Sequence, residues 1–197
     1  MESVTINSLH FFDIKKRQTQ KDMNINIIKL TDDSLMRTAC EFTMHKKNSN
    51  MTLDKIYKCQ HSPIRTQIFC IKLIDIPTFV SVHFVRHNIG VTHFVMSNRD
   101  DRGGDGDNNV NRLTPVNHMM IINAEAIINL SRKRLCYQAH EETRKWMEGI
   151  KQHMIYVDQT LAKYMVPECI YRGGKCHELR SCGHLKELID QYECKND

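Results

Sequence analysis

The sequence has few aromatic residues, a single tryptophan and no long apolar run. Aromatic side chains make up 7% of its 197 residues. No apolar stretch approaches the roughly 20 residues needed to span a bilayer, so we expect no membrane-spanning helix. The N-terminus, MESVTINSLHFFDIKK, lacks the basic segment followed by an apolar one that marks a secretory signal. We find no internal repeat either.

What is present is typical of a soluble globular protein. The hydrophobic fraction is 41% and the charged fraction 26%, and the length predicts one domain with a substantial core. A chain of this size does not need disulfides, so we expect its eight cysteines to be reduced thiols in a cytoplasm. The net charge of +5, with eleven histidines, suits phosphate-bearing small molecules as well as nucleic acid.

The apolar patterns predict a mixed chain with few strands. Residues 24–30 and 66–74 read as strands because they are apolar and rich in β-branched residues. Helices are predicted for five segments: from a Thr31 cap to about Glu41, from Thr52 toward Lys58, from Asp75 and Pro77 through His87, from Pro115 to about Gln138, and from about Glu141 to His153. The segment DDRGGDGDNNVN, Asp100 to Asn111, predicts a loop.

One stretch concentrates cationic and polar groups directly after an apolar helix. VSVHFVRHNIGVTHFVMSNRDDR, from Val80 to Arg102, contains four cationic or imidazole groups close to His93, Ser97 and Asn98; they are Arg86, His87, Arg99 and Arg102. Guanidinium groups suit phosphate because they offer paired donors. The stretch therefore indicates a site for an anionic ligand, or else a solvated loop after a core element.

A second stretch, NAEAIINLSRKRL, has polar residues inside a predicted helix. Asparagine is a poor residue for a helix interior, yet Asn123 and Asn129 interrupt the apolar run. Asn123 and Arg134 return to within about 20° of the same helix face, about 16 Å apart along the axis. Such a face can bind an extended polar ligand such as a nucleotide. Alternatively, the amides bond to neighbouring helices and Arg134 reaches water.

Three motifs, in this order, resemble the flavin-dependent thymidylate synthases. That family has a His-x-Ser-Pro-Phe-Glu-like segment before a strand, where this chain has HSPIR, residues 61–65. Its signature Arg-His-Arg, then seven residues, then Ser-x-Arg is matched by RHN, residues 86–88, then eight residues, then SNR, residues 97–99. Its Asn-Ala-Arg-Ser-Leu-x-Asn segment with an Arg five residues on is matched by NAEAIINLSRKR. The resemblance covers about residues 25–150.

The resemblance implies a fold, a reaction and an assembly. The fold is α+β, with a central, mainly antiparallel sheet flanked by helices, over residues 1–166. The reaction is methylation of dUMP to dTMP, with methylene-tetrahydrofolate as carbon donor and NADPH reducing the FAD. In this family the active site is shared between subunits of a homotetramer.

The resemblance also implies site residues. Those matched to FAD binding are Ser62, Arg86, His87, Asn88, Asn123 and Asn129. Those matched to the nucleotide are His83, Ser97, Arg99 and Arg134. Ser97 and Arg99 would hold the phosphate. Arg134 would be catalytic, because a preplaced cation stabilises charge that develops on the uracil carbonyl.

The chain departs from the family pattern in several places, including the one extra residue before Ser97. Asn88 replaces the second motif Arg, His83 stands where a Gln is usual, and Arg65 replaces an acid. A helical stretch of some tens of residues between the second and third motifs is missing. These departures leave open a flavoprotein that modifies another pyrimidine nucleotide, or a non-catalytic nucleotide-binding protein. We expect no nucleic-acid binding, because the basic residues form no single run and no zinc-finger or helix-turn-helix spacing occurs.

The last segment, residues 167–197, forms a Cys/His-rich tail that we expect to pack on the domain. Cys169, Cys176, His177 and Cys182 offer three thiolates and one imidazole, the ligands of a closed tetrahedral zinc site. Their spacing lacks the short knuckle of two cysteines separated by two residues that makes zinc predictions specific. The alternative is reduced cysteines in a loop that packs on the body.

Overall fold

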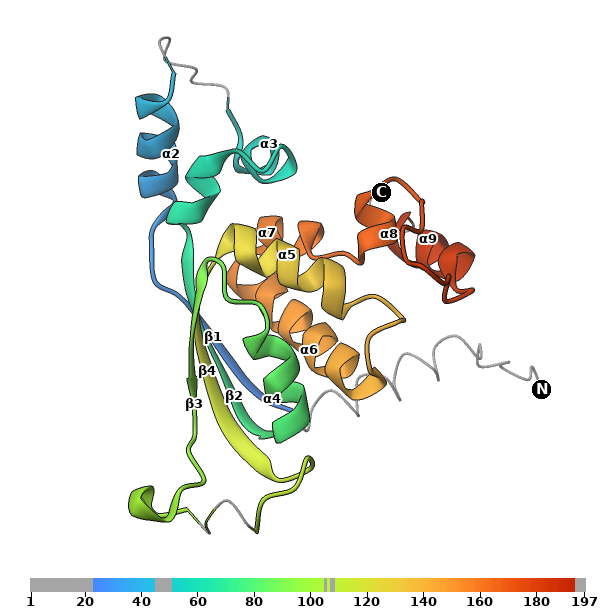
Figure 1. The fold of residues 1–197 in the computed structure, drawn as a ribbon. Helices are drawn as coiled ribbons and strands as arrows, with labels where there is room; N and C mark the ends of the chain where they lie inside the picture. Colours follow the sequence, from blue (N-terminus) through green and yellow to red (C-terminus); the bar gives the residue numbers. More distant parts are fainter. Residues whose placement is uncertain (1–22, 45–50, 105, 107–108, 194–197) are drawn as a thin grey trace, which may run out of the picture.

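The computed structural model describes residues 23–44, 51–104, 106 and 109–193. Its centre is a four-stranded antiparallel sheet, and helices pack against one face of that sheet (Figure 1). The other face carries the exposed apolar side chains of Ile28, Phe94 and Met96. The predicted α+β architecture, with a mainly antiparallel sheet, is confirmed.

The strands follow the spatial order β1 (Asn24–Lys29), β2 (Ile68–Pro77), β4 (Pro115–Asn123), β3 (Val91–Val95). Both predicted strands, β1 and β2, are therefore present. A register shift between Leu73 and Ile76 bends β2, and Asp75 in this bulge has a positive φ of 58°. Because β3 pairs with β4, the chain that follows helix α4 (Thr78–Val85) returns alongside the segment that leads into helix α5 (Ala124–Arg134).

The segment from Pro115 to about Gln138 is not the single helix that was predicted. It forms β4, and the chain then turns at Asn123 into α5. β4 buries every second side chain against the helices: Val116, His118, Met120 and Ile122. The other face of this strand also carries apolar residues, Met119 and Ile121, so the alternation is masked. A continuous apolar run does not distinguish a strand from a buried helix.

Helices α4, α5, α6 (Glu141–Val157) and α7 (Gln159–Tyr164) form the layer over the sheet (Figure 1). Trp146, Ile150 and Met154 fall at i, i+4 and i+8 of α6, and at most 5% of each is exposed. This spacing places them on one helix face. The apolar face of α6 closes the core over β1.

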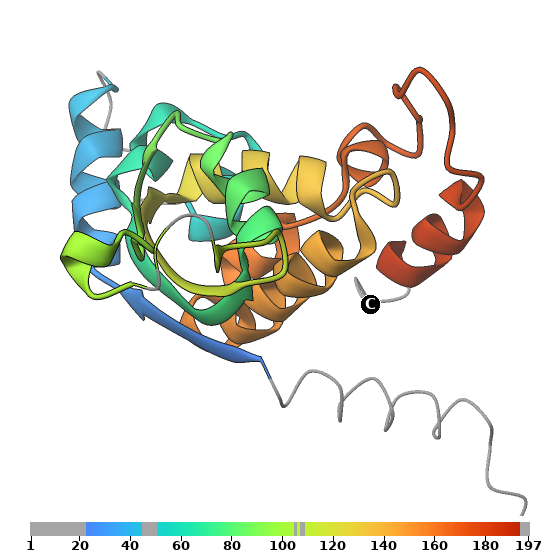
Figure 2. The same cartoon turned by 60° about the horizontal axis from the view of Figure 1, so that its bottom comes forward.

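Two further helices, α2 (Asp33–Phe42) and α3 (Leu53–Lys58), lie at one end of the sheet, next to the 3-10 turn η1 (Ser62–Thr66) (Figures 1 and 2). Asp32, and not the predicted Thr31, caps α2, because its carboxylate accepts a hydrogen bond from the Ser34 amide at 2.7 Å. The Thr31 hydroxyl instead accepts from the Ile68 amide. The predicted Thr52 cap of α3 is confirmed.

A buried carboxylate joins this end to the main core. Asp158, between α6 and α7, is 8% exposed. It accepts hydrogen bonds from the Lys29 ammonium at 2.8 Å and from the Tyr57 hydroxyl at 2.9 Å. It also accepts from the Leu161 backbone amide at 2.9 Å. Since an unpaired buried charge is costly, these three donors together make the carboxylate tolerable there. The pairing fastens β1 and α3 to the helical layer.

The tail forms two short helices, α8 (Glu168–Tyr171) and α9 (Leu185–Glu193). The Glu168 carboxylate, 6% exposed, accepts two hydrogen bonds from the Arg132 guanidinium on α5, at 2.7 and 2.9 Å. The Arg132 guanidinium also lies 4.0 Å from the centre of the Tyr171 ring. These contacts hold α8 on the body, although a domain boundary at residue 166 stays a prediction. No helix in residues 23–44, 51–104 or 109–193 has the length and apolar character of a membrane span.

Candidate functional site

The three residues of the Arg-His-Asn motif lie where α4 ends. Arg86 is the C-cap of α4, and the loop that follows reaches Gly90, which has a positive φ of 75°. A Cβ atom at Gly90 would lie only 2.6 Å from the side-chain nitrogen, Nδ2, of Asn123. Glycine is therefore required on both counts, and its absence of a side chain lets the motif loop lie against the start of α5.

Arg86 and His87 line a cavity of about 420 Å³ together with Arg134 from the end of α5. Lys133, Cys136 and Glu178 complete most of its wall. One Arg134 amino group donates to the His83 carbonyl at 2.6 Å, which fixes the guanidinium in place. The Arg134 Nε is buried and finds no acceptor among the described residues. A buried donor without a partner is the kind of group that a ligand oxygen satisfies.

The electrostatics of this cavity favour an anion. Burial, and then the charges of Arg134, His93 and Lys133, lower the pKa of His87 to about 4. Burial also lowers the pKa of His83, followed by the charges of Arg134 and Arg86. The groups that act on the pKa values of these two imidazoles, among the described residues, are Arg, Lys or His side chains, and none is acidic. Both imidazoles are therefore neutral at pH 7, and they lie in a positive field.

Among the described residues, the carboxylate in the cavity wall comes from the tail. Glu178 lies 3.7 Å from the Lys133 ammonium, and both side chains are more than a third exposed. Such an exposed pair contributes little energy and opens readily. Glu178 therefore leaves most of the positive charge uncompensated.

A buried hydrogen-bonded chain supports the motif loop from below. The Ser81 hydroxyl lies 3.1 Å from His118 Nδ1, His118 Nε2 lies 2.9 Å from His93 Nδ1, and His93 Nε2 lies 2.7 Å from the His87 carbonyl. A carbonyl only accepts, so His93 carries its proton on Nε2. Its Nδ1 then accepts from His118 Nε2, and His118 Nδ1 accepts from Ser81. Burial, and then the charge of His93, lowers the pKa of His118 to about 4, so His118 is neutral at pH 7.

His83, which stands where the family usually has Gln, has side-chain contacts with residues that do not line the cavity. Its Nδ1 lies 2.7 Å from the hydroxyl of Thr143, which is fully buried. The ring of Phe79 packs edge-on against His83 and His140, and the Arg112 guanidinium lies 4.8 Å from the centre of the Phe79 ring. His83 is therefore held in a defined orientation next to the cationic cavity.

The other residues matched to flavin binding have structural contacts of their own. The Asn123 side-chain oxygen caps α5 by accepting from the Ala126 amide at 2.9 Å, so Asn123 does not lie inside a helix as predicted. The Asn129 side-chain oxygen accepts from Arg132 at 3.1 Å. Ser62 is exposed at the start of η1. Next to it, the Arg65 guanidinium binds Glu125 through two hydrogen bonds.

Ser97 and Arg99 lie at the other end of β3. Gly90 and Asn123 mark the near end, and the seven residues from Gly90 to Ser97 correspond to roughly 20 Å of extended chain. The Arg99 guanidinium is paired with Asp101 through two contacts of 2.8 Å. One chain therefore gathers His83, Arg86, His87 and Arg134, but it does not bring Ser97 and Arg99 to them.

The described residues do not support the zinc prediction. No three His, Cys, Asp or Glu side chains converge there as a metal site requires. Cys169 is buried in α8, whereas His177 is exposed and Cys176 and Cys182 are only partly covered. Without a short knuckle between paired cysteines, the backbone does not turn these ligands toward one point.

Sequence reasoning missed several residues of the site. Lys133 was overlooked because it is not one of the matched positions of the third motif, Cys136 because it follows that motif, and Glu178 because it belongs to the tail. The buried pair Ser81 and His118 left a readable signal. A histidine inside the apolar segment VNHMMII is unusual, and a buried imidazole needs a partner.

No family model matches this sequence, and no protein of curated function matches it. The fold is nevertheless similar to solved structures. Thymidylate synthase X (ThyX) from Helicobacter pylori, crystallised with FAD and dUMP, has a TM-score of 0.51 at 12% identity, over 70% of this chain and 99% of that one. A UMP/dUMP methylase, PolB from Streptomyces cacaoi, bound with 5-bromo-dUMP, has a TM-score of 0.54 at 11% identity, over 72% and 94%. The predicted resemblance to flavin-dependent thymidylate synthases is confirmed at the level of the fold.

Proposed function

We propose that this chain is a flavin-dependent methylase of dUMP or a related pyrimidine nucleotide, using methylene-tetrahydrofolate and NADPH. One observation carries the proposal. Arg86, Lys133 and Arg134 surround a cavity of about 420 Å³, and a hydrogen bond to the His83 carbonyl fixes the Arg134 guanidinium at its wall. The fold is shared with two proteins solved with uridine nucleotides. Fold alone does not determine function, so the cationic cavity is the deciding feature.

The donor set of the cavity fits a phosphate-bearing cofactor such as FAD. Arg86 and His87, with Asn88 on the same loop, would hold it, and Ser62, Asn123 and Asn129 would add contacts. The side-chain nitrogen of Asn123, Nδ2, is still able to donate, because only the side-chain oxygen is engaged in the cap. When bound, FAD supplies the redox chemistry and the one-carbon transfer. The protein supplies orientation and charge.

Arg134 is the residue to which we assign catalysis. Its bond to the His83 carbonyl preorganises the guanidinium, and burial raises the strength of its field. A cation fixed in advance stabilises charge that grows on a uracil carbonyl without reorganising during the reaction. His83, neutral and oriented by Thr143, would contact the same base.

We propose that a second copy of the chain completes the site. Ser97 and Arg99 suit a nucleotide phosphate, but they lie roughly 20 Å along β3 from the end that carries the motif loop. Their placement at the far end of the sheet makes them available to a neighbouring molecule. A nucleotide phosphate would then replace the Asp101 carboxylate as the partner of the Arg99 guanidinium. A homotetramer would satisfy this requirement.

A different pyrimidine nucleotide is the second candidate. His83 in place of Gln presents an imidazole where an amide would read the base, and the segment that normally supplies another Arg is missing. Both differences bear on nucleotide recognition and not on the flavin. They favour a same-fold flavoprotein with another substrate, or a nucleotide-binding protein without turnover.

The test is reconstitution of the purified protein with FAD, followed by titration with dUMP and UMP. Wild-type protein is expected to hold flavin non-covalently and to show its absorption band. Arg86→Ala is expected to lower the flavin content at least about tenfold, because a charged contact is lost. Arg37→Ala on α2 is the matched control, because Arg37 lies outside the cavity. Full flavin content in Arg86→Ala would contradict the assignment. Flavin and nucleotide binding without methyl transfer would favour the non-catalytic candidate.

A further inference from the structure

One loop of the tail, residues 173–184, passes beside the wall of the cationic cavity. Its Glu178 carboxylate belongs to that wall and lies 3.7 Å from the Lys133 ammonium. Two residues further along, the Arg180 carbonyl accepts a hydrogen bond from the Gln138 side chain at 2.9 Å. This tail loop therefore brings a negative charge to a wall that is otherwise suited to the anionic group of a ligand.

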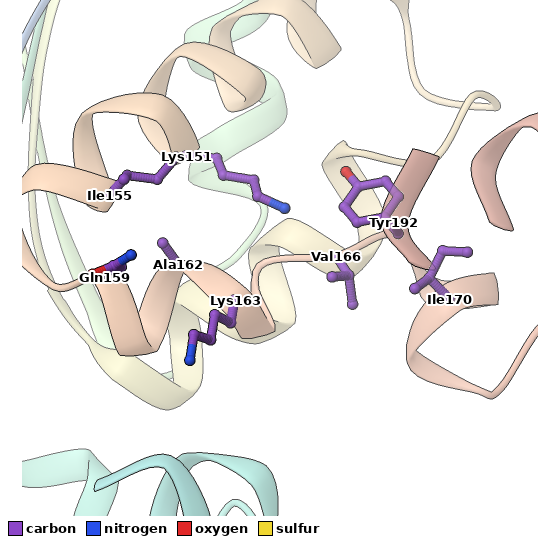
Figure 3. Close-up of a pocket in the computed structure, with 8 residues that line it drawn as sticks. All are labelled: Lys151, Ile155, Gln159, Ala162, Lys163, Val166, Ile170 and Tyr192. Carbon is purple, nitrogen blue, oxygen red and sulfur yellow. The ribbon is translucent and has the colours of Figure 1, made fainter. Parts of the chain in front are cut away.

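The helices on both sides of the tail loop are anchored to the body. Before the loop, Glu168 of α8 accepts two hydrogen bonds from Arg132 of α5. After the loop, the Leu188 side chain of α9 is only 2% exposed. The Lys151 ammonium lies 4.3 Å from the centre of the Tyr192 ring, and Figure 3 shows this side chain extending from α6 toward the ring. The loop can therefore move while α8 and α9 stay in place.

Between these anchors the tail loop is held weakly. None of its residues is buried, and the Leu179 side chain is fully exposed. The loop contains no helix or strand, and Gly174 and Gly183, near its two ends, each have a φ of 82°. A segment with so few buried contacts opens at a low cost in free energy, and its exposed ion pair adds little to hold it.

We propose that the tail loop is an autoinhibitory gate on the cavity, in which the Glu178 carboxylate competes with a phosphate-bearing ligand. The inference rests on the proposed function, because it assigns the same cavity to an anion. A phosphate that approaches Lys133 displaces the carboxylate, since two anions beside one ammonium repel each other. Phosphate carries more charge and more acceptor oxygens than a carboxylate, and Arg86 and Arg134 lie in the same wall. The ligand therefore binds the open loop in preference and shifts the equilibrium toward it.

The reactivity of the Cys182 thiol reports whether the tail loop is open. This thiol is partly covered in the closed loop, whereas the Cys59 thiol at the end of α3 is exposed and serves as the internal control. Saturating inorganic pyrophosphate at pH 8 is expected to speed the alkylation of Cys182 by iodoacetamide at least about threefold, because the ligand holds the loop open. Mass spectrometry measures both rates, and that of Cys59 should not change. Unchanged or slower alkylation of Cys182 would overturn the proposal, because the loop would then ignore the ligand or close over it.

A charge variant tests the competition directly. Glu178→Gln keeps the size of the side chain and removes its charge, so it is expected to tighten pyrophosphate binding about fivefold, as an exposed ion pair allows. Asp190→Asn is the matched control, because it makes the same change of net charge at an exposed position of α9 that does not line the cavity. Its pyrophosphate affinity should stay within about twofold of wild type, and titration calorimetry measures all three proteins.

Pyrophosphate needs neither flavin nor nucleotide, so the outcomes separate the gate from the proposed function. Equal pyrophosphate affinity in wild type and Glu178→Gln would refute the gate alone. No pyrophosphate binding by either protein would refute both, because the cavity would then not be an anion site. Loss of flavin binding or methyl transfer, with faster alkylation of Cys182 and tighter binding by Glu178→Gln, would contradict only the proposed function.

Discussion

Arg65 and Glu125 show how two departures from a family pattern accommodate each other. The family pattern has an acid at the first position and an Arg at the second, whereas this chain has the charges reversed. The structure joins the two side chains by contacts of 2.7 and 3.2 Å. The acid and the Arg of the family pattern have therefore exchanged places between η1 and α5. The two side chains still form an ion pair next to Ser62.

The imidazole chain from Ser81 to His87 is the second feature at the scale of residues. Each donor in it meets one acceptor, so the loop that carries Arg86 is held by a network that is buried at Ser81 and His118 and partly buried at His93. Removing one member leaves the others without partners, at a cost of about 1–3 kcal/mol for each buried group. The chain also fixes the tautomers of His93 and His118.

We expect His93→Ala to loosen the motif loop without touching the ligand. The His87 carbonyl loses its donor, and the amides of residues 87–90 should then exchange at least about tenfold faster, as local opening becomes easier. Hydrogen exchange followed by NMR measures this. His153→Ala is the control, because His153 bonds only to the Gly149 carbonyl of its own helix among the described contacts. Nitrogen-15 spectra of the wild type should place the protons of His93 and His118 on Nε2; protons on Nδ1 would refute the network.

At the scale of elements, α8 shows how a short helix is held by charge. Four residues make too short a helix to be stable by themselves. Its Glu168 carboxylate is paired with Arg132 on α5 and with Arg172 at the end of α8. Hydrogen bonds from Arg132, and then from Arg172, outweigh burial and lower the pKa of Glu168 to about 2.

This pairing predicts a stability that depends on pH. The pKa of Glu168 falls from its ordinary value of 4.5 to about 2 on folding, so its contribution is complete above pH 4.5 and is lost as pH falls toward 2. The shift corresponds to roughly 3 kcal/mol. We therefore expect wild type to exceed Glu168→Gln in free energy of unfolding at pH 7, and the difference to shrink steadily below pH 4.5. Urea unfolding at pH 7, 4.5 and 3 measures this, and a difference independent of pH would contradict it.

At the scale of the whole molecule, the site residues separate into two groups. Arg86, His87 and Arg134 line the cavity, and Ser97 and Arg99 lie at the opposite end of β3. The face of the sheet between β1 and β3 exposes Ile28, Phe94 and Met96, each more than 40% accessible. Both features fit an assembly in which one chain supplies the cavity and another the phosphate contacts.

A complementation experiment tests the shared site. Arg134→Ala is expected to lower kcat about a hundredfold, because it removes a preorganised charge. Arg99→Ala is expected mainly to raise KM for the nucleotide, because the phosphate contact is equal in ground and transition states. Mixing the two variants under conditions that exchange subunits should restore up to about a quarter of wild-type activity per chain, as random pairing of two defective halves allows. Activity no higher than the sum of the separate variants would show that each chain carries a complete site.

The sequence by itself determined the local features. The β1 and β2 segments, the Thr52 cap and the helix ending at the Arg-His-Asn motif follow from periodicity and capping, which depend on near neighbours. The three motifs in order were sufficient to predict the fold, because their spacing along the chain reflects one arrangement of strands and helices. The tertiary structure decided what depends on distant partners. Pairing of β4 with both β2 and β3 made a strand of an apolar run that also suits a helix. The arrangement of α4 and α5 over the sheet brought Arg134 to the His83 carbonyl and beside Arg86, while the direction of β3 carried Arg99 away from them. Burial then set the protonation of His87 and His118, and no spacing in the sequence encodes burial.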